Sequence, residues 1–204
     1  MERALLSLGV PSNIEKKVRE LKTSLYREGG LVSAQALPVL IPLCFVPPAA
    51  GGQKREALRD ALRRAVGRQA PLLRSGSILE RDGFLLWNLE PADELQRLSR
   101  NGAEVFAGQA DQPKLFPVAR GFVLCSLECR SPSELPSLDA PEPLSFPAKA
   151  AVLLRLRSLD AEPGALEGES PATEVPLSEA GPWWRSLFWE ELERIPLRKS
   201  RAAD

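Results

Sequence analysis

The chain has 204 residues, of which 44% are hydrophobic and 26% are charged, a composition typical of a globular domain with a substantial core. Lys and Arg together number 27, as do Asp and Glu, so the net charge is zero and no global field favours a nucleic acid, a membrane or an acidic partner. The sequence holds no histidine, which excludes any mechanism that needs an imidazole.

The first two predicted elements are a strand and a helix. Residues 3–10 form an apolar run of strand length that ends at a proline. Ser12 and Glu15 have the spacing of a capping box, which predicts a helix with Ser12 at its N-cap. The helix is expected to end at Gly29-Gly30. Its apolar face is predicted to consist of Ile14, Val18, Leu21 and Leu25.

Residues 37–46 form a second apolar run of strand length. Pro38 and Pro42 are awkward inside it, because proline cannot donate a hydrogen bond to a sheet. Residues 53–69 then predict an amphipathic helix, whose apolar face carries Leu58, Leu62 and Val66.

Asp82-Gly83 is a strong hairpin signal between predicted strands at 77–81 and 84–89. A short helix is expected at 92–99. The remaining predicted segments are a strand at 116–129, a proline-rich loop at 130–147, a strand at 148–159, an acidic loop at 160–174, an aromatic segment with a short helix at 183–197, and a basic tail at 198–204. The alternation of strands and helices predicts one α+β domain over residues 1–204.

No stretch approaches the length of a membrane span, and charge follows the N-terminus too soon for a signal peptide. Cys44, Cys125 and Cys129 do not make an even set of disulfides, so we expect thiols and a cytoplasmic protein. Three thiols without a histidine also lack the paired spacing of a zinc site, and we expect no metal and no cofactor.

The order and spacing of these elements resemble the bacterial 2′-5′ RNA ligase and cyclic phosphodiesterase family of the 2H phosphoesterases. The opening strand, proline and helix match the start of that family, and the Asp82-Gly83 hairpin matches the stretch between its two motifs. Residues 40–46 and 116–125 match its two motif strands, and residues 189–197 match its last element. The resemblance covers nearly the whole chain. It implies two pseudo-symmetric lobes of mixed or antiparallel sheet, with flanking helices, around a central cleft.

Each lobe of that family carries one His-x-Thr/Ser motif, and both motifs are lost here. The first histidine and its hydroxyl partner align with Leu40 and Pro42, and the second pair aligns with Gly121 and Val123. In-line attack on a cyclic phosphate needs a base and an acid, roles that imidazoles fill near neutral pH. The resemblance therefore implies the fold without the phosphoesterase activity.

Cys44 and Cys125 each lie two residues beyond a vacated hydroxyl position. Because alternate residues of a strand share a face, we expect both thiols to line the cleft. One interpretation is a redox-active or nucleophilic pair. The other, which we favour because no base is evident beside them, is two small buried hydrophobic residues.

Arg120 adjoins the second vacated motif, where it either meets a phosphate in the cleft or is an ordinary charge at a strand end. Arg55, Arg59 and Arg63 align at i, i+4 and i+8 on the helix predicted at 53–69. They form either a stripe that contacts phosphates or, as is more common, a solvated helix face.

Trp183, Trp184, Phe188 and Trp189 form an aromatic cluster near the C-terminus. The i, i+4 spacing of Trp184 and Phe188 puts both on one face of the predicted helix. The cluster is either a stacking or partner surface or, more commonly, part of the core.

Three functional hypotheses follow. The first is a catalytically silent module that binds a nucleotide, an RNA end or a protein segment in its cleft. The second is an enzyme of divergent chemistry, based on a cysteine or on residual phosphoesterase activity. The third is a structural subunit with a filled cleft. An open, arginine-lined groove would favour nucleotide binding, whereas a cleft plugged by Leu40 and Val123 would favour the structural role.

Overall fold

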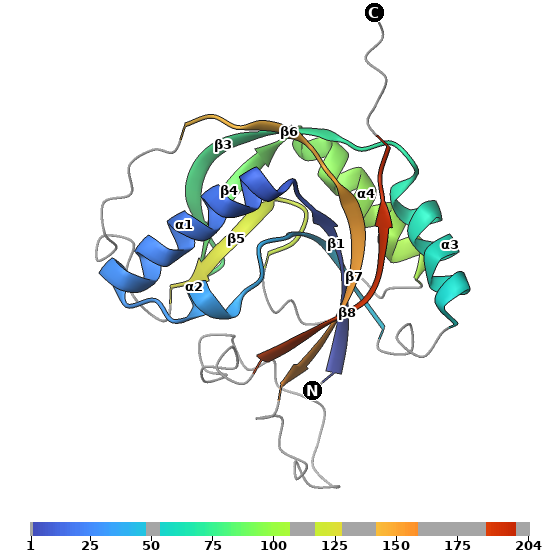
Figure 1. Ribbon diagram of the computed structural model, residues 1–204, viewed down its shortest axis with the longest axis horizontal. Helices are drawn as coiled ribbons and strands as arrows, with labels where there is room; N and C mark the ends of the chain where they lie inside the picture. Colours follow the sequence, from blue (N-terminus) through green and yellow to red (C-terminus); the bar gives the residue numbers. More distant parts are fainter. Residues whose placement is uncertain (1, 48–53, 107–116, 128–141, 159–186, 199–204) are drawn as a thin grey trace, which may run out of the picture.

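The computed structural model describes residues 2–47, 54–106, 117–127, 142–158 and 187–198. These residues form two four-stranded antiparallel sheets with helices packed on them (Figure 1). The first sheet has the order β2-β1-β7-β8 and consists of β1 (Glu2–Gly9), β2 (Ile41–Val46), β7 (Ala150–Ser158) and β8 (Leu187–Pro196). The second has the order β5-β4-β3-β6 and consists of β3 (Leu72–Arg81), β4 (Phe84–Glu90), β5 (Gly121–Ser126) and β6 (Ser145–Pro147).

The helices are α1 (Ser12–Gly29), α2 (Ser33–Ala36), α3 (Arg55–Val66) and α4 (Ala92–Val105). Helix α4 packs on β2, and α3 packs on β7 and β8, so this pair covers the first sheet. Helices α1 and α2 contact β5 of the second sheet. The arrangement confirms the predicted α+β fold of two sheet-based lobes with flanking helices.

The two sheets meet through a group of buried apolar side chains that we call the inner cluster. β1, β2 and β7 contribute Leu5, Phe45 and Leu154 to it, and β4 and β5 contribute Leu86 and Val123. The opposite faces of the same strands pack with the helices in a larger core. These strands therefore bury both faces, which explains their nearly continuous apolar sequences.

Strands β2, β5 and β8 each contain a bulge that changes which side chains face the inner cluster. In β2, Leu6 lies opposite Cys44 and Ser7 lies opposite Pro42, so Leu43 has no partner in β1. β5 skips one residue against β4, and β8 skips one against β7. Across such a bulge, residues two apart face opposite sides of the sheet. The skipped residues are Leu43, Leu124 and Leu192.

Two turn predictions are confirmed. Asp82 and Gly83 both have positive φ, 52° and 74°, as a type I′ hairpin turn requires, and they join β3 to β4. Gly30 closes α1 in the left-handed conformation with φ of 65°, and its N–H donates to the carbonyl of Tyr26.

The predicted capping box at Ser12 is wrong. Pro11 occupies the N-cap, and its carbonyl accepts the N–H groups of Ile14 and Glu15 at 3.0 and 2.9 Å. Because Ser12 already lies in the first turn, its hydroxyl makes no cap hydrogen bond. The strand expected at 37–46 begins only at Ile41, beyond Pro38, and the bulge in β2 accommodates Pro42.

The short helix predicted within 183–197 is also wrong, because residues 187–196 form β8 and pair with β7 over its whole length. Pairing with a buried neighbour here overrides the local helical pattern. Part of the predicted proline-rich loop forms β6, and α4 extends well beyond the short helix expected at 92–99. Residues 130–141, the acidic loop at 160–174, Cys129, Trp183, Trp184 and the tail after Arg198 lie outside the described residues.

None of the helices within the described ranges is both long enough and apolar enough to cross a membrane.

Candidate functional site

The structure brings together three of the four residues that we predicted at the vacated motif positions. Leu40, Pro42 and Val123 line one small hollow between β2 and β5, and Trp189 of β8 closes it from the side. Only about 10 Å³ of free space remains there. Apolar side chains therefore fill the space between β2 and β5, the strands predicted to match the two motif strands. The remaining lining residues are Leu5, Leu37 and Pro38.

The fourth position, Gly121, begins β5 opposite Asn88. A Cβ atom at Gly121 would lie 2.1 Å from the backbone oxygen of Trp87, a distance that no side chain tolerates. The backbone itself therefore excludes a side chain at Gly121, the residue that we predicted at the second histidine position.

The two cysteines do not face one cleft, so that expectation is wrong. The bulges at Leu43 and Leu124 turn both thiols away from the inner cluster and into the larger core. Cys44 lies against Gly102 of α4, whereas Cys125 lies near Lys22 of α1. Burial raises the pKa of the Cys44 thiol to about 12, which disfavours the reactive thiolate.

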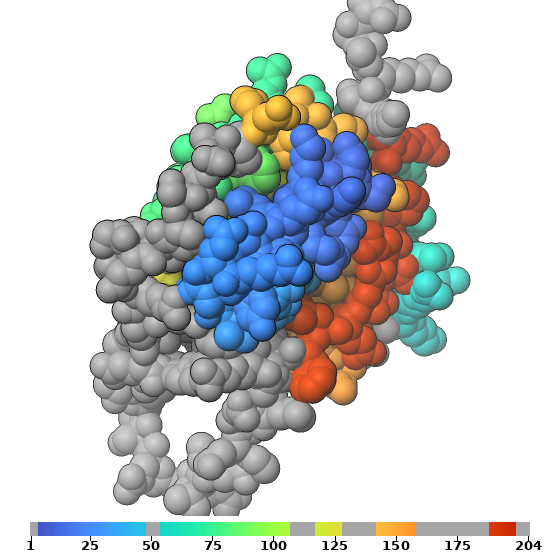
Figure 2. Space-filling view, turned by 60° about the vertical axis from the view of Figure 1, so that its left-hand side comes forward, coloured from blue at the N-terminus to red at the C-terminus, as the bar shows by residue number. Residues whose placement is uncertain are grey.

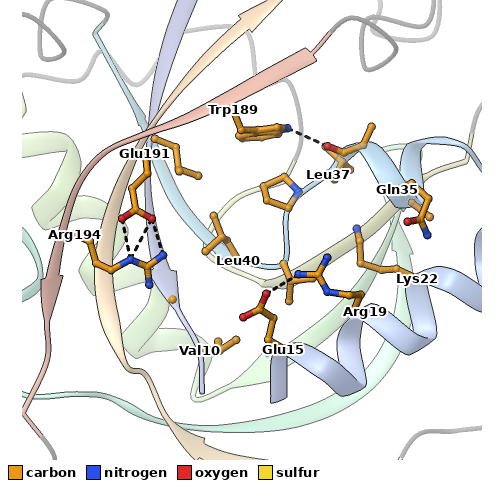
Figure 3. Close-up of a pocket in the computed structure, with 16 residues that line it drawn as sticks. Val10, Glu15, Arg19, Lys22, Gln35, Leu37, Leu40, Trp189, Glu191 and Arg194 are labelled. Carbon is orange, nitrogen blue, oxygen red and sulfur yellow. Dashed lines mark hydrogen bonds and ion pairs between the residues drawn. The ribbon is translucent and has the colours of Figure 1, made fainter. Parts of the chain in front are cut away.

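An open groove of about 410 Å³ lies beside the filled hollow, between α1 and β8. Figure 2 shows α1 and the segment that follows it in blue, next to β8 in red. Figure 3 shows the basic side chains Arg19 and Lys22 on the α1 side, with Glu191 and Arg194 on the β8 side and Leu40 between them. The groove also contacts Leu154 of β7 and residues 34–40.

The charges of the groove are partly paired. Arg19 Nη2 lies 2.6 Å from the carboxylate of Glu15, and Arg194 Nη2 lies 2.7 Å from that of Glu191. The hydrogen bonds from Arg194 lower the pKa of Glu191, while the same bonds raise the pKa of Arg194. At one end of the groove, Trp189 Nε1 donates to the carbonyl of Ala36 at 3.0 Å, which orients the indole ring.

Lys22 is the buried basic residue of this site, with 3% of its surface exposed. Its Nζ donates to the backbone oxygens of Leu124 at 2.8 Å and Val123 at 3.3 Å in β5, an edge strand of the second sheet that α1 contacts. Burial is the main cause that lowers the pKa of Lys22 to about 7, and the nearby charge of Arg19 lowers it further.

No protein-family model matches the chain, and no curated protein matches it by sequence. Solved structures match its fold. A crystal structure of a phosphoesterase is 11% identical, and the match covers 97% of this chain and 99% of that protein with a TM-score of 0.56. LigT of E. coli, in complexes with 3′-AMP and with NADP+, is 13% and 14% identical; each match covers 96% of this chain and 98% of LigT with a TM-score of 0.56. The chain has the 2H phosphoesterase fold.

The arginine stripe lies on α3, on the side of the first sheet opposite the groove. Arg55 Nε and Arg59 Nε lie 2.6 and 3.2 Å from the carboxylate of Glu193 in β8, and Arg63 pairs with Asp60 at 3.0 Å. Two arginines of the stripe thus attach a helix to a sheet through a buried carboxylate, a role that neither interpretation of the sequence included.

Arg120 and Phe188 also lie away from the groove lining. The carbonyl of Arg120 accepts the N–H of Leu89 at 2.9 Å just before β5, and its side chain is half-buried. Phe188 lies in β8 with 56% of its surface exposed. No group of three or more Cys, Asp and Glu side chains that could hold a metal ion occurs among the residues that the structure describes.

The groove residues Arg19, Lys22 and Arg194 were not among those predicted from the sequence. One signal was present: Lys22 follows Val18 by four residues and precedes Leu25 by three, so it occupies the apolar face of α1. The structure buries Lys22 there and leaves the predicted Leu21 only half-buried. Nothing local signalled Arg194, because its orientation depends on the bulge in β8.

Proposed function

We propose that this chain is a catalytically silent protein of the 2H phosphoesterase fold that binds a small anionic ligand, of the nucleotide or RNA-end class, between α1 and β8. The observation that supports the proposal is a filled apolar hollow, at the predicted motif positions, beside an open polar groove. Leu40, Pro42 and Val123 fill the space between the motif strands and offer no group that moves a proton or holds a phosphoryl oxygen. The groove next to them is large enough for a small ligand.

The lining of the groove suits such a ligand. Arg19 and Arg194 supply guanidinium groups on opposite walls, and guanidinium is well matched to phosphate and carboxylate oxygens. The fixed ring of Trp189 supplies an aromatic surface on which a base can stack. LigT, which shares the fold, was crystallised with 3′-AMP and NADP+, and this makes 3′-AMP a rational first probe.

Two measurements test the proposal. The purified protein should hydrolyse a 2′,3′-cyclic nucleotide no faster than the buffer blank, and calorimetry should detect binding of 3′-AMP. Arg194→Met should weaken that binding about tenfold, because one charge-assisted contact is lost. Arg100→Met, a matched change on the exposed surface of α4, should leave binding unchanged. Hydrolysis by the wild-type protein, or equal affinity of Arg194→Met and wild type, would count against the proposal.

The filled hollow also favours a second candidate function, that of a structural subunit. The apolar side chains of Leu40 and Val123 pack between the two sheets and stabilise their contact, and this packing needs no ligand. A stable assembly in sedimentation experiments, together with no binding of 3′-AMP, would favour this role. A cysteine-based enzyme has less support, because Cys44 is buried with a strongly raised pKa.

A further inference from the structure

Lys22 and Arg19 place two positive groups side by side on one wall of the groove. They are three residues apart on α1, which puts them on the same face of the helix. Both line the groove, and Figure 3 shows both side chains extending from α1 into it. Their mutual repulsion is one of the causes that lower the pKa of Lys22.

Lys22 has no carboxylate partner within the part of the chain that the structure describes. Its two acceptors there are the backbone oxygens of Val123 and Leu124. An ammonium group has three N–H donors, so one remains for a ligand. A buried ammonium without a counter-ion is costly, and an oxyanion placed between Lys22 and Arg19 would remove that cost.

We propose that Lys22 and Arg19 together anchor one oxyanion group, a phosphate, sulfate or carboxylate, of the ligand in this groove. This inference rests on the proposed function and specifies the atoms that hold the anion. Lys22 Nζ supplies its third N–H, and Arg19 supplies the guanidinium edge not used by Glu15.

The same geometry couples binding to protonation. With a pKa of about 7, the Lys22 amine is largely neutral slightly above neutral pH, whereas an anion beside it favours the charged form. The other ionisable groups around it are Glu15 and Arg19 of α1, Cys125 of β5, and Glu191 and Arg194 across the groove. The carboxylates of Glu15 and Glu191 are already paired with arginines. Anion binding should therefore draw a proton onto Lys22.

Calorimetric titrations with sulfate and with 3′-AMP from pH 6 to pH 9 test this inference. Sulfate stays ionised throughout, so its pH dependence reports the protein alone. The affinity for sulfate should be flat below about pH 7 and should fall by up to tenfold per pH unit above it. Titrations in buffers of different ionisation enthalpy should show net proton uptake on binding, and the uptake should increase as the pH rises above about 7.

Three variants separate the contributions. Lys22→Arg keeps a permanent charge, so it should retain binding and lose both the pH dependence above pH 7 and the proton uptake. Arg19→Met changes a side chain that is 65% exposed, should fold normally, and should weaken binding about tenfold. Arg100→Met is the matched surface control.

The outcomes distinguish this inference from the proposed function. If 3′-AMP binds equally well to wild type, Arg19→Met and Lys22→Arg with the same pH profile, the anchor is wrong and the binding function stands. If sulfate shows the expected profile but 3′-AMP does not bind, the anchor stands and the nucleotide class is wrong. If neither probe binds, both are overturned.

Discussion

Pro42 and Cys44 are two residues apart in β2 and face opposite sides of the first sheet, because Leu43 has no partner in β1. A bulge at the equivalent place in β5 separates Val123 from Cys125 in the same way. Pro42 and Val123 therefore fill the space between the sheets, whereas the two thiols pack in the larger core with the helices.

This orientation predicts inert thiols. In a Cys129→Ser background, which removes the cysteine outside the described residues, Cys44 and Cys125 should react with a maleimide at pH 8 at least roughly a hundredfold more slowly than in denaturant. The reasons are the raised pKa of Cys44 and the complete burial of Cys125. Peptide mapping after timed labelling measures each rate. Labelling of native Cys44 at the rate of an exposed thiol would show that the assigned packing is wrong.

Glu193 should stabilise the protein through its two arginine partners. Its carboxylate is 1% exposed and accepts hydrogen bonds from Arg55 and Arg59. Burial alone would raise the pKa of Glu193, but these bonds and the N–H of Arg194 outweigh burial and lower it. Glu193→Gln should reduce the free energy of unfolding by about 1.5–3 kcal/mol at pH 7.

The pH dependence of this effect has a definite sign. A carboxyl group with a lowered folded-state pKa stabilises the native protein above its unfolded pKa, near 4.3, and loses that contribution as the pH falls through the folded value. The stability difference between wild type and Glu193→Gln in urea titrations should therefore shrink as the solution is acidified. Glu190→Gln, on an exposed side chain, is the matched control and should change stability little. A difference that grows in acid would refute the ion-pair assignment.

Gly102→Ala should destabilise the protein although alanine is the better helix former. A Cβ at position 102 would lie 2.6 Å from Leu6 Cδ2 and 2.8 Å from Cys44 Sγ, between α4 and the first sheet. Overpacking of this kind costs about 1–3 kcal/mol, which exceeds the gain in helix propensity of about 1 kcal/mol. Cys44→Ala should partly rescue the variant in a double-mutant cycle measured by denaturant unfolding, because it removes one of the two clashing atoms. Additive effects would argue against direct contact.

Gly121→Ala should be more damaging, because the obstacle is the Trp87 backbone oxygen and not a flexible side chain. We expect a loss of about 3 kcal/mol or more, or failure to fold. Gly76→Ala is the control, because a Cβ added at Gly76 would meet only ordinary contacts at 3.8 Å or more. The melting temperatures of the two variants in thermal unfolding measure the difference. Equal melting temperatures for the two variants would show that β5 can move away from β4.

Because of Lys22, the free energy of unfolding of the wild-type protein should increase as the pH rises from about 7 toward 10. The folded-state pKa of about 7 lies below the ordinary value of 10.5, so the unfolded chain binds more protons in this window and stability increases with pH. Lys22→Met should lack this component of the pH profile. Urea unfolding of both proteins at pH 7, 8 and 9 gives the comparison, and parallel profiles would mean that Lys22 is charged in the native state.

Features that depend only on residues close together in the chain could be predicted from the amino-acid sequence. Asp82-Gly83 specified a type I′ hairpin because both positions accept positive φ, and the periodicity of apolar residues located α1 and α3. The absence of histidine excluded imidazole chemistry whatever the fold, because a missing residue type cannot be supplied by packing.

Contacts between segments far apart in the chain instead determine which side chains lie together in the candidate site. The register between strands far apart in the chain creates the bulges in β2, β5 and β8, and each bulge reverses the faces of the residues that follow it. Glu191 and Glu193 illustrate this: they are two residues apart, yet Glu191 lines the groove and Glu193 binds α3. Long-range pairing sets these positions, so no local pattern in the sequence could have predicted them.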